Sequence, residues 1–190
     1  MMSKKMAIVY FSHTGATRML AERISAGSTA AGVTTTQIEI LSSDIVEGRY
    51  IRQDIFNVLQ QQDAIVFGSP TYMGSAAAQF KAFMDASSND YVDLAWRNKL
   101  AAGFTVGGSL NGEQQQTLLS FFTLACQHAM LWAGLDTSQH NDQLKLNRTG
   151  SSIGLVASTL PDSSLVDDND LATAYYFGQR LAHCLSLHNH

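Results

Sequence analysis

Apolar runs alternate with amphipathic stretches along this chain. Four runs of apolar, largely β-branched or aromatic residues, at 6–11, 64–68, 100–106 and 153–157, are typical of strands covered on both faces. Residues 33–40 alternate apolar with polar positions, which predicts a further strand near a sheet edge. Helical spacing predicts helices between these strands, at 17–31, 51–59, around 80–84, from about 113 to 129, and at 171–185.

Strands that alternate with helices predict a single α/β domain over residues 1–190. Such a chain requires right-handed crossovers and a doubly wound, five-stranded parallel sheet with helices on both faces. We expect the strand order 2-1-3-4-5, in which strands 1, 3 and 4 are neighbours. Ligands of such sheets bind beyond the carboxyl ends of the strands, where the strand order reverses. The loops after strands 1, 3 and 4 should therefore meet at one crevice.

The loop after the first strand has the composition of an anion-binding site. It contains small hydroxyl residues and one Gly, and it leads into a helix whose first backbone N–H groups lack helical partners. The loop has no Lys, unlike the P-loop, and no predicted strand is followed by the dinucleotide motif GxGxxG. A single terminal phosphate fits this neutral loop; an ordinary turn whose hydroxyls only cap the helix is the alternative. The predicted phosphate-binding residues are Ser12, His13, Thr14, Gly15, Ala16 and Thr17.

The loops after strands 3 and 4 favour a planar ligand. Pro70 fixes a turn that continues with an aromatic residue, a thioether and a Gly, and such a loop can lie flat against a ring. Gly107 and Gly108 let the backbone approach a ligand because they carry no Cβ. Ordinary turn chemistry explains either loop alone, whereas a planar ring beside a single phosphate suggests FMN. The predicted ring-binding residues are Pro70, Thr71, Tyr72, Met73, Gly74, Gly107, Gly108 and Ser109.

Composition excludes several other classes of function. The net charge of −4, from 12 basic and 16 acidic residues, disfavours nucleic acid and anionic membranes as partners. Cys126 and Cys184 lie in helical patterns without CxxC or metal-ligand spacing, so we expect two buried thiols and no metal site. The chain shows neither a secretory signal pattern before the first strand nor an apolar run of membrane-spanning length, which predicts a cytoplasmic location.

Four sequence motifs occur in a diagnostic order. They are residues 10–17; residues 69–74, which continue into 77–85; Trp96 with 99–101; and residues 107–109, followed by Glu113, Gln114 and a helix that reaches His128. With these motifs the chain resembles, over nearly its whole length, the WrbA (tryptophan-repressor-binding protein A) family of flavodoxin-like NAD(P)H:quinone oxidoreductases. The second motif is the most diagnostic of the set.

The resemblance implies a flavodoxin-like fold with FMN as the cofactor and NAD(P)H as a transient co-substrate. It also implies that residues 12–17 hold the FMN phosphate and that the loops at 70–74 and 107–109 hold the isoalloxazine ring. Trp96 then walls the pocket and His128 approaches a flavin from across a subunit interface, so both are candidate catalytic residues of a homotetramer, or at least a homodimer. The residues alone leave open that Trp96 belongs to the core and that His128 caps a helix.

The function that follows is two-electron reduction of a quinone by NAD(P)H. Because no separate dinucleotide motif exists, we expect the nicotinamide and the quinone to occupy one pocket in turn, which gives ping-pong kinetics. A flavodoxin-type electron carrier and a flavin-binding interaction protein without turnover stay open as alternatives. Carriers are usually strongly acidic around the flavin, which a net charge of −4 supports poorly. The long connection at 87–98 carries Tyr91, Leu94 and Trp96, so we expect it to form an oligomer contact.

Overall fold

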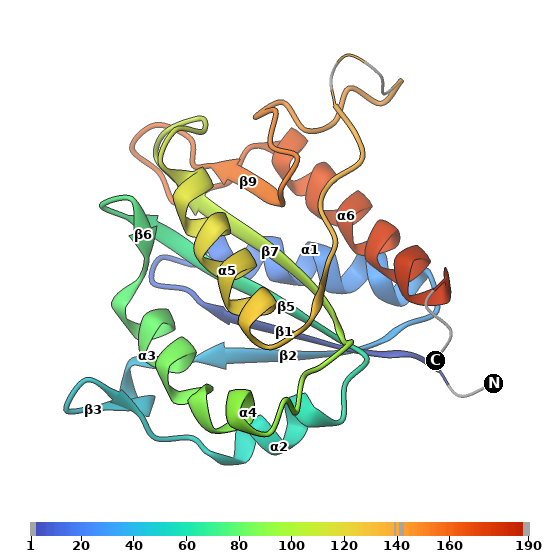
Figure 1. Ribbon diagram of the computed structural model, residues 1–190. Coiled ribbons are helices and arrows are strands. Elements are labelled where there is room, and N and C mark those ends of the chain that lie inside the picture. Colours follow the sequence, from blue (N-terminus) through green and yellow to red (C-terminus); the bar gives the residue numbers. More distant parts are fainter. Residues whose placement is uncertain (1–2, 139, 141–142, 188–190) are drawn as a thin grey trace.

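A parallel sheet forms the centre of the molecule. The computed structural model describes residues 3–138, 140 and 143–187 of the chain. The sheet has the order β2-β1-β5-β7-β8, and each neighbouring pair in this order is parallel (Figure 1). The predicted order 2-1-3-4-5 and the flavodoxin-like fold are thereby confirmed. These strands are β1 (Lys5–Phe11), β2 (Thr34–Ile40), β5 (Ala64–Tyr72), β7 (Leu100–Gly107) and β8 (Leu131–Trp132).

Two short strands share the fifth position of the sheet. β8 pairs with the start of β7, at Leu100 and Ala101, whereas β9 (Leu155–Ser158) pairs with its end. β8 was not predicted, because two residues are too few to show a period. The helix predicted from about 113 to 129 ends at Gln127. Ala129, with a left-handed φ of 55°, then turns the chain toward β8.

Helices cover both faces of the sheet, as predicted (Figure 1). α1 and α6 pack on Met6 and Ile8 of β1, and α3 and α5 pack on the side that holds Ala7 and Val9. This division follows from the strand period of two, which sends successive side chains to opposite faces. The helices are α1 (Ala16–Ala30), α2 (Asp54–Gln60), α3 (Ala78–Ala86), α4 (Ser88–Val92), α5 (Gln114–Gln127) and α6 (Asp168–Leu187), and the remaining short elements are η1 (Ser42–Asp44), β3 (Ile45–Val46), β4 (Arg49–Tyr50) and β6 (Ser75–Ala76).

Glycines bring α1 and α6 into close contact. A Cβ on Gly178 would overlap the carbonyl oxygen of Ile24, and a Cβ on Gly27 would overlap that of Tyr175. In addition, the hydroxyl of Ser28 donates a hydrogen bond to the carbonyl oxygen of Gly178 over 3.0 Å. This packing fixes α1 against α6 and the sheet, and the N-terminus of α1 lies at the carboxyl edge of the strands.

Candidate functional site

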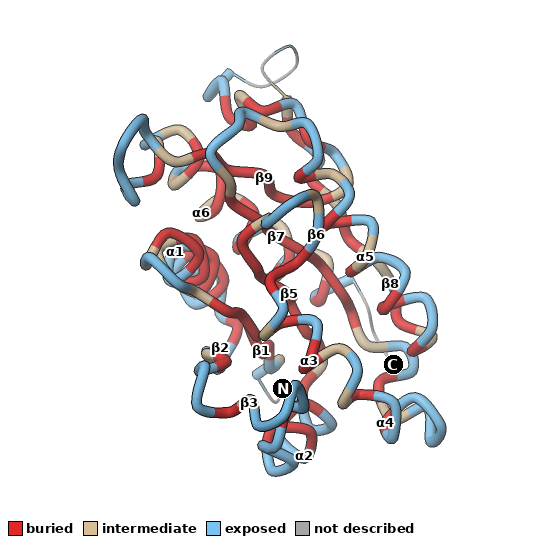
Figure 2. Tube along the Cα trace, turned by 90° about the vertical axis from the view of Figure 1, so that its left-hand side faces the viewer, coloured by how far each residue is buried: buried red, intermediate tan, exposed pale blue. Residues whose placement is uncertain are grey.

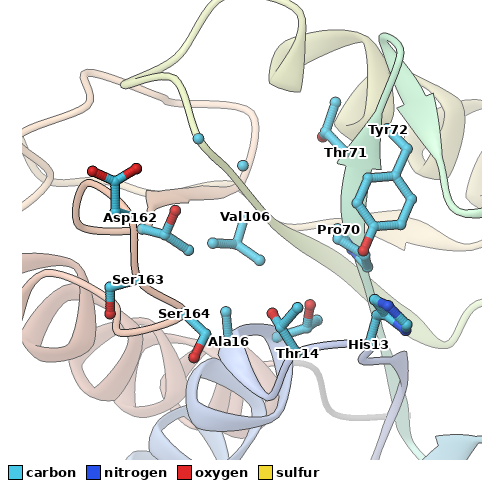
Figure 3. Close-up of a pocket in the computed structure, with 14 residues that line it drawn as sticks. His13, Thr14, Ala16, Pro70, Thr71, Tyr72, Val106, Asp162, Ser163 and Ser164 are labelled. Carbon is cyan, nitrogen blue, oxygen red and sulfur yellow. The ribbon is translucent and has the colours of Figure 1, made fainter.

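The loops at the carboxyl ends of the strands enclose two adjoining cavities. The central strands are buried along most of their length, whereas these loops carry exposed residues (Figure 2). The cavities have volumes of about 460 Å³ and about 450 Å³ and share Thr71, Gly107 and Gly108 as lining residues. Sites for small ligands are typically of this size. The first cavity is lined by His13, Thr14, Ala16, Thr17, Pro70, Thr71, Tyr72, Val106, Gly107, Gly108, Thr159, Asp162, Ser163 and Ser164 (Figure 3).

The first loop ends at the N-terminus of α1, beside the first cavity. Gly15 is the N-cap and has a left-handed φ of 98°, which glycine adopts without strain. The Ser12 hydroxyl accepts a hydrogen bond of 3.3 Å from the backbone N–H of Arg18 and so holds the first turn of the helix. Thr14 and Thr17 border the cavity. The positive end of the helix dipole favours an anion at this N-terminus, and the first turn of α1 contains no acidic residue that would take its place.

A chain of hydroxyl groups fixes the end of β5. The Thr105 hydroxyl donates to the carbonyl oxygen of Ser69 over 2.7 Å. The Thr71 hydroxyl lies 2.8 Å from the hydroxyls of both Thr105 and Thr117. Since the Thr105 proton is directed to Ser69, Thr71 donates to Thr105 and Thr117 donates to Thr71. These bonds join β5, β7 and α5 beneath the crevice.

A two-residue hairpin follows β5 and borders both cavities. β5 pairs with β6, and Met73 and Gly74 form the turn with φ values of 48° and 76°. Positive φ at both central residues is required in a type I′ turn. Met73 thus adopts a left-handed conformation, which is uncommon for a residue with a side chain, and its side chain is fully exposed. Tyr72 lines the first cavity and Met73 lines the second.

A buried glutamine shapes the loop after β7. Gln114 Nε2 donates to the carbonyl oxygens of Ser109 over 2.5 Å and of Asn111 over 3.2 Å. A Cβ on Gly107 would lie 3.1 Å from Gln114 Cδ, whereas one on Gly108 would meet no heavy atom within 4 Å among the described residues beyond its chain neighbours. Gly108 therefore presents bare backbone to the crevice. The second cavity is lined by Thr71, Met73, Gly74, Gly107, Gly108, Ser109, Asn111, Glu113 and Gln114.

The three predicted loops come together, and a fourth wall joins them that the sequence analysis missed. This wall is the loop after β9, and the rule that ligands bind at carboxyl ends of strands was the signal that could have found it. Ser12 and Gly15, predicted to bind phosphate, shape their loop without lining either cavity. The lining residues outside the predicted set are Val106, Asn111, Glu113, Gln114, Thr159, Asp162, Ser163 and Ser164.

The two predicted catalytic residues, Trp96 and His128, do not line the crevice. Both are buried, and their rings stack with centroids 4.1 Å apart and planes at 23°. His128 Nε2 lies 3.0 Å from the hydroxyl of Ser87, and burial lowers the pKa of His128 to about 4. Trp96 precedes β7 and His128 follows α5, so both lie where the strands begin, at the opposite edge of the sheet. Within the single chain both are core residues away from the crevice, and the catalytic roles that the resemblance implied for them stay predictions.

The structure also bears on the expectations about the two cysteines and about metal binding. Cys126 is exposed and Cys184 is partly buried, so the prediction of two buried thiols was wrong. Within residues 3–138, 140 and 143–187, no group of three or more His, Cys, Asp or Glu is arranged to hold a metal ion. None of the helices in that part of the chain is both long enough and apolar enough to cross a membrane.

The lining residues fit FMN. At one end of the crevice, the N-terminus of α1 and the hydroxyls of Thr14 and Thr17 offer donors for one phosphate, and neither cavity is lined by Lys or Arg. At the other end, Gly108 leaves space over its backbone and Tyr72 supplies an aromatic face. Asp162 is the one acidic residue among those that line the first cavity, and Figure 3 shows it apart from Thr14. A cradle of hydroxyl and backbone donors beside an open slot matches a molecule that joins a single phosphate to a planar ring.

Known proteins place the chain in a family. The model of the NADPH-dependent FMN reductase family matches residues 6–134. Flavodoxin FldP of Pseudomonas aeruginosa (strain UCBPP-PA14) is 34% identical over 184 residues, which cover 94% of this chain and 95% of that protein. An NAD(P)H dehydrogenase (quinone) of Caulobacter vibrioides (strain NA1000 / CB15N) is 30% identical over 190 residues, with 94% and 95% covered.

One solved structure agrees with these relatives. The crystal structure of a flavodoxin, WrbA-like protein from Agrobacterium tumefaciens is 33% identical and has a TM-score of 0.76, over 98% of this chain and 100% of that chain. The resemblance found in the sequence is thereby confirmed. The chain belongs to the NADPH-dependent FMN reductase family, as a WrbA-type, FMN-dependent oxidoreductase.

Proposed function

We propose that this chain binds FMN in the crevice and reduces quinones by two electrons with NAD(P)H as the donor. The observation that carries this proposal is the convergence of the loops on one crevice, with a phosphate cradle at one end and bare glycine backbone at the other. The names of relatives at 29% and 30% identity, NAD(P)H dehydrogenase (quinone), support the choice of substrates.

Each loop has a binding role in this proposal. Residues 12–17 hold the phosphate, with His13, Thr14, Ala16 and Thr17 along the cavity. Residues 70–74 and 107–109 hold the ring, and backbone N–H groups near 73 and 108 are available as donors to its polar edge. When bound, FMN supplies the chemistry of accepting a hydride from NAD(P)H and passing two electrons to a quinone. The protein contributes binding and orientation and limits the access of water.

The two substrates share one site in this proposal. The crevice is the place where the described loops leave room beside the ring-binding residues, and the sequence holds no GxGxxG motif for a separate dinucleotide site. Nicotinamide and quinone then bind in turn, so initial-rate plots at several quinone concentrations should give parallel lines. Competitive inhibition of the nicotinamide by high quinone follows from the same sharing.

We also propose a homo-oligomer, at least a dimer and, by the family resemblance, a tetramer. The segment 87–98 exposes apolar side chains at Tyr91, Val92 and Leu94, and such a cluster favours contact with a second copy. Because Trp96 and His128 are buried, they would not complete a neighbour's pocket as the chain stands. A light-scattering mass equal to one chain of 20.7 kDa would contradict the oligomer.

Absorbance spectroscopy tests the function directly. The purified protein is loaded with FMN, and its visible absorbance is followed after NADH or NADPH is added and again after a small quinone is added. The proposal expects bleaching by the nicotinamide, recovery with the quinone, and steady-state turnover with parallel initial-rate lines. Failure to retain FMN would overturn the binding site, and intersecting lines would overturn the shared substrate site.

An electron carrier is the second candidate, and one observation favours it. Trp96 and His128, the two residues that the resemblance linked to turnover, lie outside the crevice, and Flavodoxin FldP is similar over almost the whole chain. A carrier would hold FMN as tightly but would oxidise NAD(P)H with a quinone only slowly. The same steady-state assay therefore separates the two functions.

A further inference from the structure

An ion pair between a partly buried arginine and a buried aspartate lies behind the fourth wall of the crevice. Arg148 Nε donates to Asp170 Oδ1 over 2.9 Å, and Arg148 Nη2 donates to Asp170 Oδ2 over 2.7 Å. Asp170 lies in the first turn of α6 and is 1% exposed. This two-pronged geometry is the arrangement that holds a carboxylate in a single orientation. Arg148 belongs to the polar excursion between β8 and β9, for which the sequence suggested no role.

The same arginine holds the last residue of β9. Arg148 Nη2 donates to the Ser158 hydroxyl over 2.6 Å, and the Ser158 backbone N–H donates to Asp170 Oδ2 over 2.8 Å. Arg148 Nε also lies 3.3 Å from Asp167 Oδ1. Arg148 thus contacts both Ser158, before the crevice loop, and Asp167, after it.

The loop between these two anchors closes on itself. Thr159 and Val166 form an antiparallel bridge, and the backbone N–H of Leu160 donates to the carbonyl oxygen of Leu165 over 2.8 Å. The backbone N–H of Thr159 donates to the carbonyl oxygen of Gly107 over 3.0 Å, which ties the loop to the Gly107–Gly108 side of the crevice. The loop is therefore a closed, hydrogen-bonded unit held at its two ends.

Hydroxyl groups from this loop complete the cradle around the start of α1. Thr159, Ser163 and Ser164 line the first cavity, and Figure 3 shows Ser163 and Ser164 on the side next to Ala16, away from Tyr72. The residues that line this cavity include one carboxylate, Asp162 of the same loop, and no Lys or Arg, so hydroxyl and backbone donors must solvate a bound phosphate. Their placement depends on how firmly the loop is held.

We propose that Arg148 is a positioning residue for phosphate binding. Through Ser158 and Asp167 it holds the 159–166 loop so that its hydroxyls face the N-terminus of α1, although Arg148 itself does not line the cavity. This inference rests on the proposed function, in which the crevice binds FMN through its phosphate. A role in stability alone is the alternative, because Arg148 also joins β9 to α6.

Paired affinities for FMN and riboflavin separate these two roles, since the two ligands differ only in the phosphate. Dissociation constants for both are measured by quenching of flavin fluorescence, together with urea unfolding, for wild type, Arg148→Met and Arg148→Lys. We expect Arg148→Met to weaken FMN by about tenfold while riboflavin affinity stays unchanged. Arg148→Lys, which keeps the charge but not the two-pronged geometry, should fall between wild type and Arg148→Met.

Arg180, on α6 with Asp170, provides a matched control. It pairs with Asp136 over 2.6 Å and donates to the carbonyl oxygen of Gly134 over 2.7 Å, and its side chain is 25% exposed against 23% for Arg148. Arg180→Met should leave the ratio of FMN affinity to riboflavin affinity at the wild-type value, even if it lowers the free energy of unfolding. If Arg148→Met weakens both flavins equally, or changes only stability, the positioning role is overturned.

Two further results keep the test decisive. If Arg148→Met does not fold, Ser158→Ala removes only the hydroxyl that Arg148 holds, and it should lower the ratio by about threefold. An unchanged ratio in Ser158→Ala would overturn the inference. If wild type itself binds FMN and riboflavin equally, the phosphate site of the proposed function fails, which is a different outcome from a failure of Arg148 alone.

Discussion

At the carboxyl edge of the sheet, Gly108 and Met73 lie open to the crevice, whereas at the amino edge the polar rings of Trp96 and His128 are buried. Met73 stands fully exposed on its hairpin, and Gly108 has open space over its backbone. At the other edge, Trp96 and His128 are buried against each other, and neither Trp96 Nε1 nor His128 Nδ1 has a hydrogen-bond partner among the described residues. The carboxyl edge is therefore built to receive a ligand, and the amino edge to close the core.

The aromatic packing explains why the amino edge serves stability. Trp96 stacks on His128 at 4.1 Å and lies 6.4 Å from Phe56 and 6.2 Å from Phe67, measured between ring centroids. Such a cluster contributes apolar burial and favourable ring contacts, but it offers no opening to a substrate. The comparison predicts that substitutions at the two edges separate stability from flavin binding.

The largest effect is expected for Trp96→Ala. Removing a fully buried indole should lower the free energy of unfolding by roughly 3–5 kcal/mol, because the neighbouring rings cannot fill the space. Urea unfolding measures this loss, and fluorescence titration of the folded protein should show unchanged FMN affinity. Tyr72→Ala, on the half-exposed aromatic of the crevice, is the counterpart and should weaken FMN with little loss of stability. If Trp96→Ala is stable but fails to bind FMN, the assignment of stability to the amino edge and of flavin binding to the carboxyl edge is wrong.

The next effect concerns the pH dependence that His128 gives to stability. Burial lowers the pKa of His128 from its ordinary value of 6.5 to about 4, so between these values the unfolded chain binds a proton that the folded chain does not. The free energy of unfolding should therefore fall as the pH drops from about 6.5 toward 4, by at most about 3 kcal/mol. Above that window His128 is neutral in both states and contributes no slope.

Urea unfolding at several pH values measures this slope. His128→Gln should flatten it relative to wild type, whatever the variant's stability at neutral pH. His183→Gln, at an exposed position of α6, is the matched control and should keep the wild-type slope because it leaves His128 and its surroundings in place. Equal slopes in wild type and His128→Gln would mean that His128 is not held neutral in the core.

Most of the fold could be predicted because each long element carries its own signal. The apolar run at the start of the chain became β1, and Gly32, with a φ of 89°, lies just beyond α1 where the sequence placed the stop. β8 could not be predicted, since two residues leave no periodic trace and their strand pairing depends on β7. The hairpin between β5 and β6 was read only as a turn for the same reason.

The site was predictable as far as topology determines it. Three loops lie together because parallel strands end at one edge, and that holds without knowledge of any side chain. The same rule could have placed the loop after β9 beside them, because that strand was predicted, but the position of this loop depends on long-range contacts between Arg148, Ser158 and Asp170 that no local sequence pattern indicates. Chain direction could have placed Trp96 away from the crevice of its own chain, since a residue just before a strand of a parallel sheet lies at the amino edge.

A smaller effect is expected at the phosphate end of the crevice. Thr17 is buried and lines the first cavity, so Thr17→Val keeps the shape of the side chain while removing one donor. The loss of a hydrogen bond to a charged group should weaken FMN by roughly 1.5–3 kcal/mol at most, with no change for riboflavin. Thr123→Val, on the exposed side of α5, removes a hydroxyl that donates to the Leu119 carbonyl oxygen away from the crevice, and it should leave both affinities unchanged. Equal weakening of FMN and riboflavin by Thr17→Val would place the phosphate elsewhere.

The smallest effect on stability is expected when glycine replaces one residue of left-handed φ at each edge of the sheet. Met73 and Ala129 have left-handed φ values of 48° and 55°, which cost strain that glycine avoids. Relief of this strain raises the free energy of unfolding, and the greater freedom of glycine in the unfolded chain offsets part of the gain. Met73→Gly and Ala129→Gly should therefore each raise the free energy of unfolding by only about 0.5–1 kcal/mol. Ala129 follows α5 at the amino edge, so Ala129→Gly should leave FMN binding unchanged. Met73→Gly removes the thioether that lines the second cavity, so the same gain in stability should come with weaker FMN binding. Urea unfolding and flavin titration of the two variants test this pair, and a loss of FMN affinity in Ala129→Gly, or none in Met73→Gly, would contradict the division of roles between the edges.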